Sequence, residues 1–337
     1  MAKIVQTSSQ KRVPLAELLP LHQPFAIHIF PSYYCNFKCF YCIHSLGDEG
    51  FASLGHKKSL MSFDTLKNAV DSCAQFGNKL KVMSFAGHGE PLVNRELPRM
   101  ISYARDKAVA DRLELVTNGY LLDSETSLAL VSAGLNNLRV SIQGLSSAKY
   151  RDVAGAEVDF EKLVRQLDFF YRNKGNCDVY IKVVDSALEK GEDERFYEIF
   201  GKVSDRIAIE HVVPTNQGVD YSRLGRDFDK TQQGYEHHRV SVCPMPFYVV
   251  IIGPEGDVRT CCGTKFPVLI GNVNKESLPD LWRSKRLRTF QKMLLTGGRF
   301  KHPVCQTCTS PDYGGQPGDS LDEHAEEILK KIQDIEN

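Results

Sequence analysis

Short apolar runs alternate with longer amphipathic stretches between about residues 25 and 215. The short runs are rich in β-branched and aromatic residues, which favour strands, and the longer stretches repeat apolar residues at helical spacing. The predicted strands cover residues 25–30, 81–86, 113–117, 138–142, 179–184 and 207–213. The predicted helices cover residues 62–76, 95–107, 124–133, 159–172 and 192–203.

This alternation predicts βα units whose strands form a parallel sheet. In such a sheet the functional side chains gather at the carboxyl ends of the strands. Six units are too few for a closed eight-stranded barrel. We therefore expect an α/β fold built as an open partial (βα)6 barrel.

The chain changes character at Pro214, which cannot donate to a sheet ladder and is a natural stop for the sixth strand. Residues 214–239 are polar and turn-rich, which predicts a linker. Apolar runs at 247–252 and 258–261 flank a Gly-Pro-Glu-Gly-Asp turn and predict a hairpin. The stretch 321–335 has helical spacing and predicts a helix that packs one face against the body.

The length of 337 residues exceeds the size at which a single core usually stops growing. We expect an N-terminal extension over 1–24 and a core domain over 25–235. A small β-hairpin and helix domain should follow over 236–312, and a tail helix over 313–337.

The charge balance limits the classes of partner. Lys and Arg number 42 and Asp and Glu number 42, so the formal net charge is zero. A protein that grips nucleic acid or an anionic membrane usually carries a basic excess, so we expect neither partner. The sequence has no run of about 18 apolar residues and no signal-like N-terminus, so we expect a cytoplasmic protein.

Ten cysteines need an explanation. In a reducing compartment, clustered cysteines indicate metal ligands or redox groups rather than disulfides. Cys73 lies in a predicted helix, where we expect a small buried residue, and Cys177 receives no role. The other eight form two groups, Cys35, Cys39 and Cys42, and then Cys243, Cys261, Cys262, Cys305 and Cys308.

The first group follows the first predicted strand directly. Thiolates of Cys35, Cys39 and Cys42 on one loop can converge on a small cluster, and soft sulfur ligands suit iron–sulfur chemistry. Three cysteines would leave one iron of a four-iron cluster open. A zinc site completed by His44 is the less favoured alternative, because zinc sites prefer paired ligands on separate knuckles.

This C-x3-C-x2-C motif after the first strand resembles the signature of the radical S-adenosylmethionine (radical SAM) superfamily. The resemblance implies a [4Fe–4S] cluster whose open iron chelates the amino and carboxyl groups of S-adenosylmethionine. The segment Gly87-His-Gly-Glu-Pro91 after the second strand resembles the family's Gly-Gly-Glu-Pro segment, which contacts the methionine amino group. Gly87, Gly89 and Glu90 are the residues it implies, and the intervening His88 leaves open which glycine acts.

Further positions match the family at later strand ends. Thr117 and Asn118 follow the third strand, where the family often has a turn beside the ribose. Ser141 and Gln143 lie at the end of the fourth strand, where a polar residue is common near the ribose or methionine carboxylate. Tyr41, between the last two cysteines, occupies the aromatic position that packs on adenine.

In the second group, a hairpin and a distant C-x2-C knuckle supply the thiolates, which alone could hold zinc or an iron–sulfur cluster. The spacing C-x12-G-x4-C with a final C-x2-C resembles the SPASM/Twitch extension of radical SAM enzymes. No cysteine follows residue 308, so the resemblance implies one auxiliary [4Fe–4S] cluster. Its implied ligands are Cys243, Cys261, Cys305 and Cys308.

Cys261 and Cys262 are adjacent, and the spacing from the glycine favours Cys261 as the ligand. Cys262 is then either a small buried residue or a free thiol facing the substrate. A free thiol there is the candidate hydrogen donor if the enzyme is an epimerase.

The resemblance implies cleavage of S-adenosylmethionine to a 5′-deoxyadenosyl radical that abstracts hydrogen from a substrate, with a reductant such as flavodoxin or ferredoxin as partner. Peptide-modifying members often carry a leader-binding module before the first motif, and only 34 residues precede Cys35. We therefore expect a small polyol, sugar or aminocyclitol as substrate, modified by dehydrogenation or epimerisation.

Two alternatives stay open, a peptide maturase and a non-catalytic zinc-binding module. Neither substrate identity nor oligomeric state follows from the sequence. Glu210 and His211, at the sixth strand, are equally compatible with structural and with acid–base roles.

Overall fold

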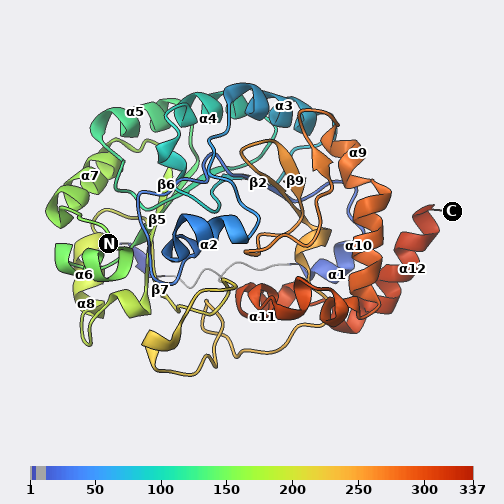
Figure 1. Cartoon of the computed structure of the whole chain (residues 1–337). Coiled ribbons are helices and arrows are strands. Elements are labelled where there is room, and N and C mark those ends of the chain that lie inside the picture. The colour runs from blue at the N-terminus through green and yellow to red at the C-terminus, as the bar shows by residue number, and fades with distance from the viewer. Residues whose placement is uncertain (1, 5–12, 337) are drawn as a thin grey trace.

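The computed structural model describes residues 2–4 and 13–336. One sheet of ten strands runs in the order β1-β7-β6-β5-β4-β3-β2-β8-β9-β10. Its centre is six parallel strands that follow one another in chain order, which confirms the open partial (βα)6 barrel (Figure 1). They are β2 (Ala26–Ile29), β3 (Val82–Phe85), β4 (Leu113–Thr117), β5 (Asn137–Ile142), β6 (Asp178–Val184) and β7 (Arg206–Glu210).

Helices cover the convex face of this curved sheet (Figure 1). Their buried apolar residues pack on the strands in one large core. Three of them begin at a side-chain cap, from Ser62, Asp123 or Asp159, whose oxygen accepts a hydrogen bond from a backbone amide of the first turn. The helices are α3 (Phe63–Ala74), α4 (Leu97–Asp106), α5 (Ser124–Ser132), α7 (Phe160–Asn173) and α8 (Asp193–Phe200).

The sixth predicted strand is too long. Strand β7 ends at Glu210 rather than at residue 213. The amide of His211 donates to the carbonyl of Gln232 at 3.0 Å, and the amide of Val212 donates to Asp185 at 3.1 Å. The backbone therefore leaves the sheet to bind the linker before Pro214 is reached.

Several short elements were not predicted. Strand β1 (Lys3–Ile4) pairs in parallel with β7. Helices α1 (Leu15–Leu18), α2 (Gly47–Ser53) and α6 (Ser147–Ala154) are too short to show a helical period in the sequence. Figure 1 shows α2 within the hollow of the curved sheet, where it follows the first cysteine group.

The predicted hairpin is present as β8 (Val249–Ile252) and β9 (Asp257–Arg259), and β10 (Gly271–Asn272) pairs with β9. Strand β8 also pairs in parallel with β2, so the C-terminal region extends the same sheet. A second, smaller core joins α1 to the C-terminal helices. The C-terminal helices in this second core are α10 (Lys285–Leu295) and α12 (Ala325–Glu336). Helix α9 (Leu278–Trp282) packs into the large core instead, and α11 (Ser310–Gly314) lies between α10 and α12 in the chain.

Cys73 is 1% exposed inside α3, which confirms the small buried residue expected there. Among the described residues, no helix is both long enough and apolar enough to traverse a bilayer.

Candidate active site

The first cysteine group lies on the loop that leaves the carboxyl end of β2. Residues near the short helix α6 hold this loop: the amide of Lys38 donates to the carbonyl of Ala154 at 2.7 Å, and that of Phe40 to Val153 at 3.0 Å. The amide of Phe37 donates to Cys35 Sγ at 3.4 Å. Amide donors to sulfur are a feature of protein-bound iron–sulfur clusters.

The three sulfurs are close enough to influence one another electrostatically and are largely removed from water. Burial raises the pKa of the Cys35 thiol to about 12 and also raises the pKa values of Cys39 and Cys42. These residues therefore need a bound cation to become thiolates, which is what iron provides. The chemistry of the three cysteines fits a cluster.

The loop after β3 explains the glycines of the Gly-His-Gly-Glu-Pro segment. Gly87 has a φ of +119°, and a Cβ there would overlap the ring of Phe30. A Cβ on Gly89 would overlap the carbonyl of Ser32. Both glycines are therefore required for the backbone to pass close to the cysteine loop, which the sequence left open.

Glu90 joins this loop to the end of β4. Its carboxylate, 3% exposed, accepts hydrogen bonds from Thr117 Oγ1 at 2.6 Å, the Asn118 amide at 2.7 Å and the Leu92 amide at 3.0 Å. Burial raises the pKa of Glu90 to about 6, against the effect of those hydrogen bonds. The structure thus brings Glu90, Thr117 and Asn118 together, with Glu90 positioning the other two.

Tyr41 and Gln143 also meet. The Tyr41 hydroxyl donates to Gln143 Oε1, and Gln143 Nε2 donates to the carbonyl of Ser141 at 3.3 Å. Asn216, from the linker, donates to the Tyr41 carbonyl at 2.8 Å. The expected residues from β5 and the cysteine loop therefore form one polar group at the carboxyl edge of the sheet.

His44 is not arranged as a zinc ligand, so that alternative is wrong. Its Nε2–H donates to the carbonyl of His88 at 2.9 Å, and its Nδ1 faces Lys58 Nζ at 3.0 Å. Burial and the Lys58 ammonium lower the pKa of His44 to about 4, so the ring is neutral near pH 7.

His88 extends this path to the second cysteine group. Its Nε2–H donates to the carbonyl of Cys262 at 3.3 Å, and its ring stacks on Phe266 with centroids 5.6 Å apart. A hydrogen-bonded chain therefore runs from His44 beside the first cysteine group, through the glycine-rich loop, to the second group. The sequence showed His88 only as an extra residue in the motif.

Cys243, Cys261, Cys305 and Cys308 line one small apolar space, together with Phe290, Leu294 and several prolines. A Cβ on Gly263 would lie 3.2 Å from Cys261 Sγ and 3.5 Å from Cys308 Sγ, and the Gly263 amide donates to Cys261 Sγ at 3.2 Å. Four convergent sulfurs in an apolar space fit a fully ligated cluster.

Cys262 is exposed and lies outside this space. The sequence-based option of a small buried residue is therefore wrong for Cys262, although its surroundings still raise the pKa of the thiol to about 11. A free thiol remains chemically available at this position.

Arg299 supports the second group from behind. It is 2% exposed, pairs with Asp312 at 2.8 Å and donates to the carbonyl of Cys308 at 2.7 Å. Asp312 also accepts from the amide of Val240 at 2.9 Å. No pattern in the sequence separates Arg299 from the other basic residues around it.

The strands also place charged side chains away from the apolar core. Lys182 Nζ lies 2.6 Å from Glu210, which is 4% exposed and also accepts from Gln232 Nε2 at 2.7 Å. Deeper along the strands, Arg139 pairs with Glu114 at 3.4 Å. Parallel strands buried on both faces are usually apolar throughout. The charged residues that alternate along these strands were therefore the sequence signal that could have identified this polar site.

His211 points elsewhere. Its Nδ1 lies 2.9 Å from Asp185, which Arg226 of the linker also binds at 2.8 Å. His211 therefore belongs to a contact that ties the linker to the end of β6. Of the two neighbours Glu210 and His211, only Glu210 pairs with Lys182.

Fold and site define an α/β enzyme with two cysteine centres on one sheet. A model of the radical SAM superfamily matches residues 29–185, and a SPASM model, described as an iron-sulfur cluster-binding domain, matches residues 243–309. The chain belongs to the radical SAM superfamily and carries a C-terminal SPASM-type domain. [4Fe–4S] clusters and S-adenosylmethionine are accordingly its cofactors.

Relatives with curated names catalyse different reactions. The probable GTP 3′,8-cyclase of Methanococcus vannielii is 36% identical over 145 residues, which make up 43% of each chain, so the match spans less than half of that relative. The AdoMet-dependent heme synthase of Methanosarcina barkeri is 24% identical, with 86% of this chain and 92% of the relative covered.

Among solved structures, BtrN in complex with AdoMet and 2-DOIA is similar with a TM-score of 0.55. The two chains are 19% identical, and the match covers 84% of this chain and 92% of BtrN. The likeness shows a shared fold.

Proposed function

We propose that this chain is a cytoplasmic radical SAM oxidoreductase that dehydrogenates a small polyol, sugar or aminocyclitol. The observation that carries the proposal is the buried Lys182–Glu210 pair, which lies toward the carboxyl ends of β6 and β7, the edge that also bears the first cysteine group. Buried charges are costly unless they are paired, and they suit a ligand rich in hydroxyl or amino groups.

Separate groups of residues bind the two clusters and S-adenosylmethionine. Cys35, Cys39 and Cys42 hold the catalytic cluster, and Cys243, Cys261, Cys305 and Cys308 hold the auxiliary cluster. When bound, these groups and S-adenosylmethionine supply the 5′-deoxyadenosyl radical and an acceptor for one electron. The residues proposed to contact S-adenosylmethionine are Tyr41, Gly87, Gly89, Glu90, Thr117, Asn118, Ser141 and Gln143.

The chain's own groups bind and orient the substrate. Lys182 donates to a substrate hydroxyl, and Glu210 accepts from an amino or hydroxyl group, after each gives up part of its present contact with the other. Water must be excluded from this region, because a primary carbon radical reacts with whatever it touches. The linker contributes to that closure through Gln232, which already reaches Glu210.

Deuterated water separates dehydrogenation from epimerisation. A dehydrogenase leaves a carbonyl product without solvent deuterium at the reacting carbon, and Cys262→Ala leaves its rate intact. An epimerase takes solvent-exchanged hydrogen from a thiol, so its product carries deuterium at an inverted carbon and the Cys262 variant is inactive. The second result would refute the proposal and make Cys262 the hydrogen donor.

The heme synthase match favours a second candidate, the modification of a tetrapyrrole, because it spans most of both chains. A tetrapyrrole that binds to the holoenzyme would then show a shifted visible absorption. The Lys182→Met variant should bind it more weakly, because the carboxylates of the tetrapyrrole would pair with the Lys182 ammonium. An unchanged spectrum at saturating protein would exclude this candidate.

A further inference from the structure

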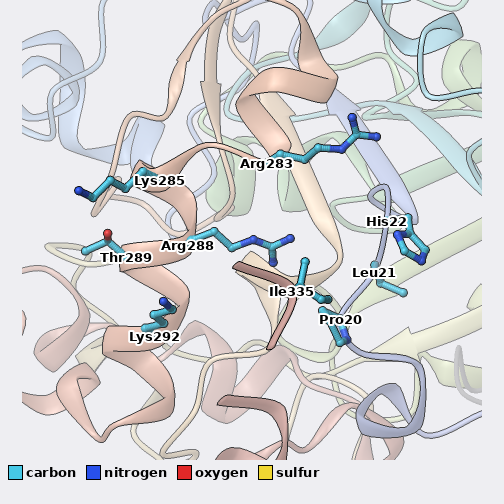
Figure 2. A pocket seen from close by; sticks show the side chains of 9 residues that line it. All are labelled: Pro20, Leu21, His22, Arg283, Lys285, Arg288, Thr289, Lys292 and Ile335. Carbon is cyan, nitrogen blue, oxygen red and sulfur yellow. The ribbon is translucent and has the colours of Figure 1, made fainter. Parts of the chain in front are cut away.

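A basic pocket lies on the outer side of the C-terminal region. Its volume is about 510 Å³, and it is formed by the start of α10, the loop at residues 20–22 before β2, and Ile335 of α12 (Figure 2). Five of its described lining residues can carry positive charge, and none of the described lining residues is acidic. The five are His22, Arg283, Lys285, Arg288 and Lys292.

The segment that contains α10 is more basic than the neutral average of the chain. Residues 283–301 contain seven Lys and Arg and no Asp or Glu, although the whole chain has a formal net charge of zero. His22, Arg283 and Lys285 are exposed. Arg288 is half-buried and donates to Gln291 Oε1 at 3.1 Å. A local excess of this kind attracts acidic partners over several ångströms of water.

Helix α10 connects the pocket with the second cysteine group. Lys285, Arg288, Thr289 and Lys292 face the pocket (Figure 2). Phe290 and Leu294, on another side of the same helix, line the apolar space that holds the four sulfurs. An α-helix with its side chains is about 10–12 Å across, so about one helix diameter separates the pocket from the space that the four sulfurs line.

We propose that this pocket is the docking surface for an acidic one-electron carrier of the flavodoxin or ferredoxin kind. The docked carrier exchanges one electron with the auxiliary cluster across α10: in turnover a cluster reduced by the substrate loses the electron and an oxidised carrier gains it, and no atom or proton is transferred. The reverse reaction, in which a reduced carrier loses the electron and the cluster gains it, uses the same contact and can be measured directly. Redox contacts of this type are small and depend on complementary charge for their rate. The inference requires the auxiliary cluster but no particular substrate.

The test compares two double charge reversals in the holoenzyme, each with exposed lysine or arginine positions. Arg283→Glu with Lys285→Glu alters the pocket. Lys190→Glu with Lys202→Glu makes the same charge change beside α8, toward the opposite end of the sheet (Figure 1). The probe is an acidic flavodoxin, studied by calorimetric binding, and by stopped-flow reduction with EPR identifying the reduced cluster.

In the pocket variant we expect flavodoxin binding and the rate of reduction by its hydroquinone to fall roughly tenfold or more at low salt, with a weaker dependence on salt. Reduction by photoreduced 5-deazariboflavin, a small uncharged reductant, should be unchanged, as should iron content. The control variant should behave as wild type.

Equal binding and equal salt dependence in the two variants would overturn the proposal. So would saturable binding of inorganic pyrophosphate in the pocket together with an unaffected flavodoxin reaction, because the pocket would then be a small-anion site. If photoreduced 5-deazariboflavin reduces no auxiliary cluster in the wild-type protein, that cluster is absent. This outcome would refute both the docking proposal and the proposed function.

Discussion

Glu90 is a buried carboxylate held by three donors from two different loops, and its ionisation should affect the stability of the fold. Burial raises its pKa to about 6, from an ordinary value of 4.5. A raised pKa means that the contribution to stability is fully present below about 4.5 and is lost as the pH rises through about 6.

Glu90→Gln removes this titration. We expect the free energy of unfolding of wild type, relative to that of the variant, to fall by roughly 1 kcal/mol between pH 5.5 and 7.5. Anaerobic urea unfolding at several pH values measures the difference. A constant difference across that range would mean that the Glu90 carboxylate is already ionised at pH 5.5.

Lys182 and Glu210 form the pair on which the proposed substrate site depends. Removing one member leaves the other buried and unpaired, so Lys182→Met or Glu210→Gln should each cost about 3–5 kcal/mol of stability. The double variant should recover part of that loss in thermal unfolding, yet still form no product while cleaving S-adenosylmethionine. Product formation by the double variant would show that the pair is only structural.

His88 tests the link between the two cysteine groups. His88→Phe keeps an aromatic ring against Phe266 but removes the donor to the Cys262 carbonyl, so the loop beside Cys261 should shift. We expect full iron content with a changed EPR spectrum for the auxiliary cluster and an unchanged one for the catalytic cluster. His237→Phe is the matched control, because it keeps an aromatic ring on Tyr313 and His237 does not line the space of the four sulfurs. Identical auxiliary spectra in wild type and His88→Phe would contradict the link.

At the scale of single residues, the sequence predicts those whose side-chain type is required by metal binding or by a close backbone contact. Cysteines, and the glycines that allow a close approach of two backbones, are recognisable one by one. Glu210, Arg299 and His88 were not assigned roles, because their roles depend on partners that are distant in the sequence, such as Lys182 and Asp312. Only the fold brings those partners together.

At the scale of elements, helix α6 anchors the cysteine loop and ends at Gly155, which has a φ of +57°. Gly155→Ala should cost roughly 1 kcal/mol, because a residue with a Cβ is strained in that conformation. Since Ala154 and Val153 bind the cysteine loop, we also expect faster loss of iron from the catalytic site when the protein is exposed to a chelator.

Gly191→Ala supplies the control for that prediction. Gly191 has a φ of +85° with no neighbour within 4 Å of its would-be Cβ, and it lies in the turn before α8. The Gly191→Ala substitution should lower the free energy of unfolding about as much as Gly155→Ala does, without changing the rate of iron loss. Equal rates of iron loss in both glycine variants would mean that α6 does not control the cysteine loop.

The long elements were predictable because their apolar period is sustained. Strand β4 was located to the residue, and α3, α5 and α7 to within two residues at each end. The end of β7 and the existence of β1 were not, since they depend on backbone hydrogen bonds to segments far along the chain. Helix α6 was missed because it is too short to show a helical period in the sequence. The parallel pairing of β8 with β2 likewise has no local signal.

For the molecule as a whole, the two cysteine groups should load independently. Changing Cys35, Cys39 and Cys42 to Ala should abolish cleavage of S-adenosylmethionine and leave about four irons per chain, because each cluster has its own ligands. Iron and sulfide analysis with a 5′-deoxyadenosine assay measures both. Continued formation of 5′-deoxyadenosine would refute the assignment, and stoichiometric zinc in active protein would refute the auxiliary cluster.

The pairing of β8 with β2 has a consequence for how the chain could be shortened. Strand β2 leads directly into the catalytic cysteine loop and is covered on one side by β3 and on the other by β8. A chain truncated after the linker would leave the backbone of β2 as a bare, apolar edge, which invites pairing with other chains. The C-terminal domain therefore acts as an edge cap, and we expect the isolated barrel to aggregate even though it retains all three catalytic cysteines.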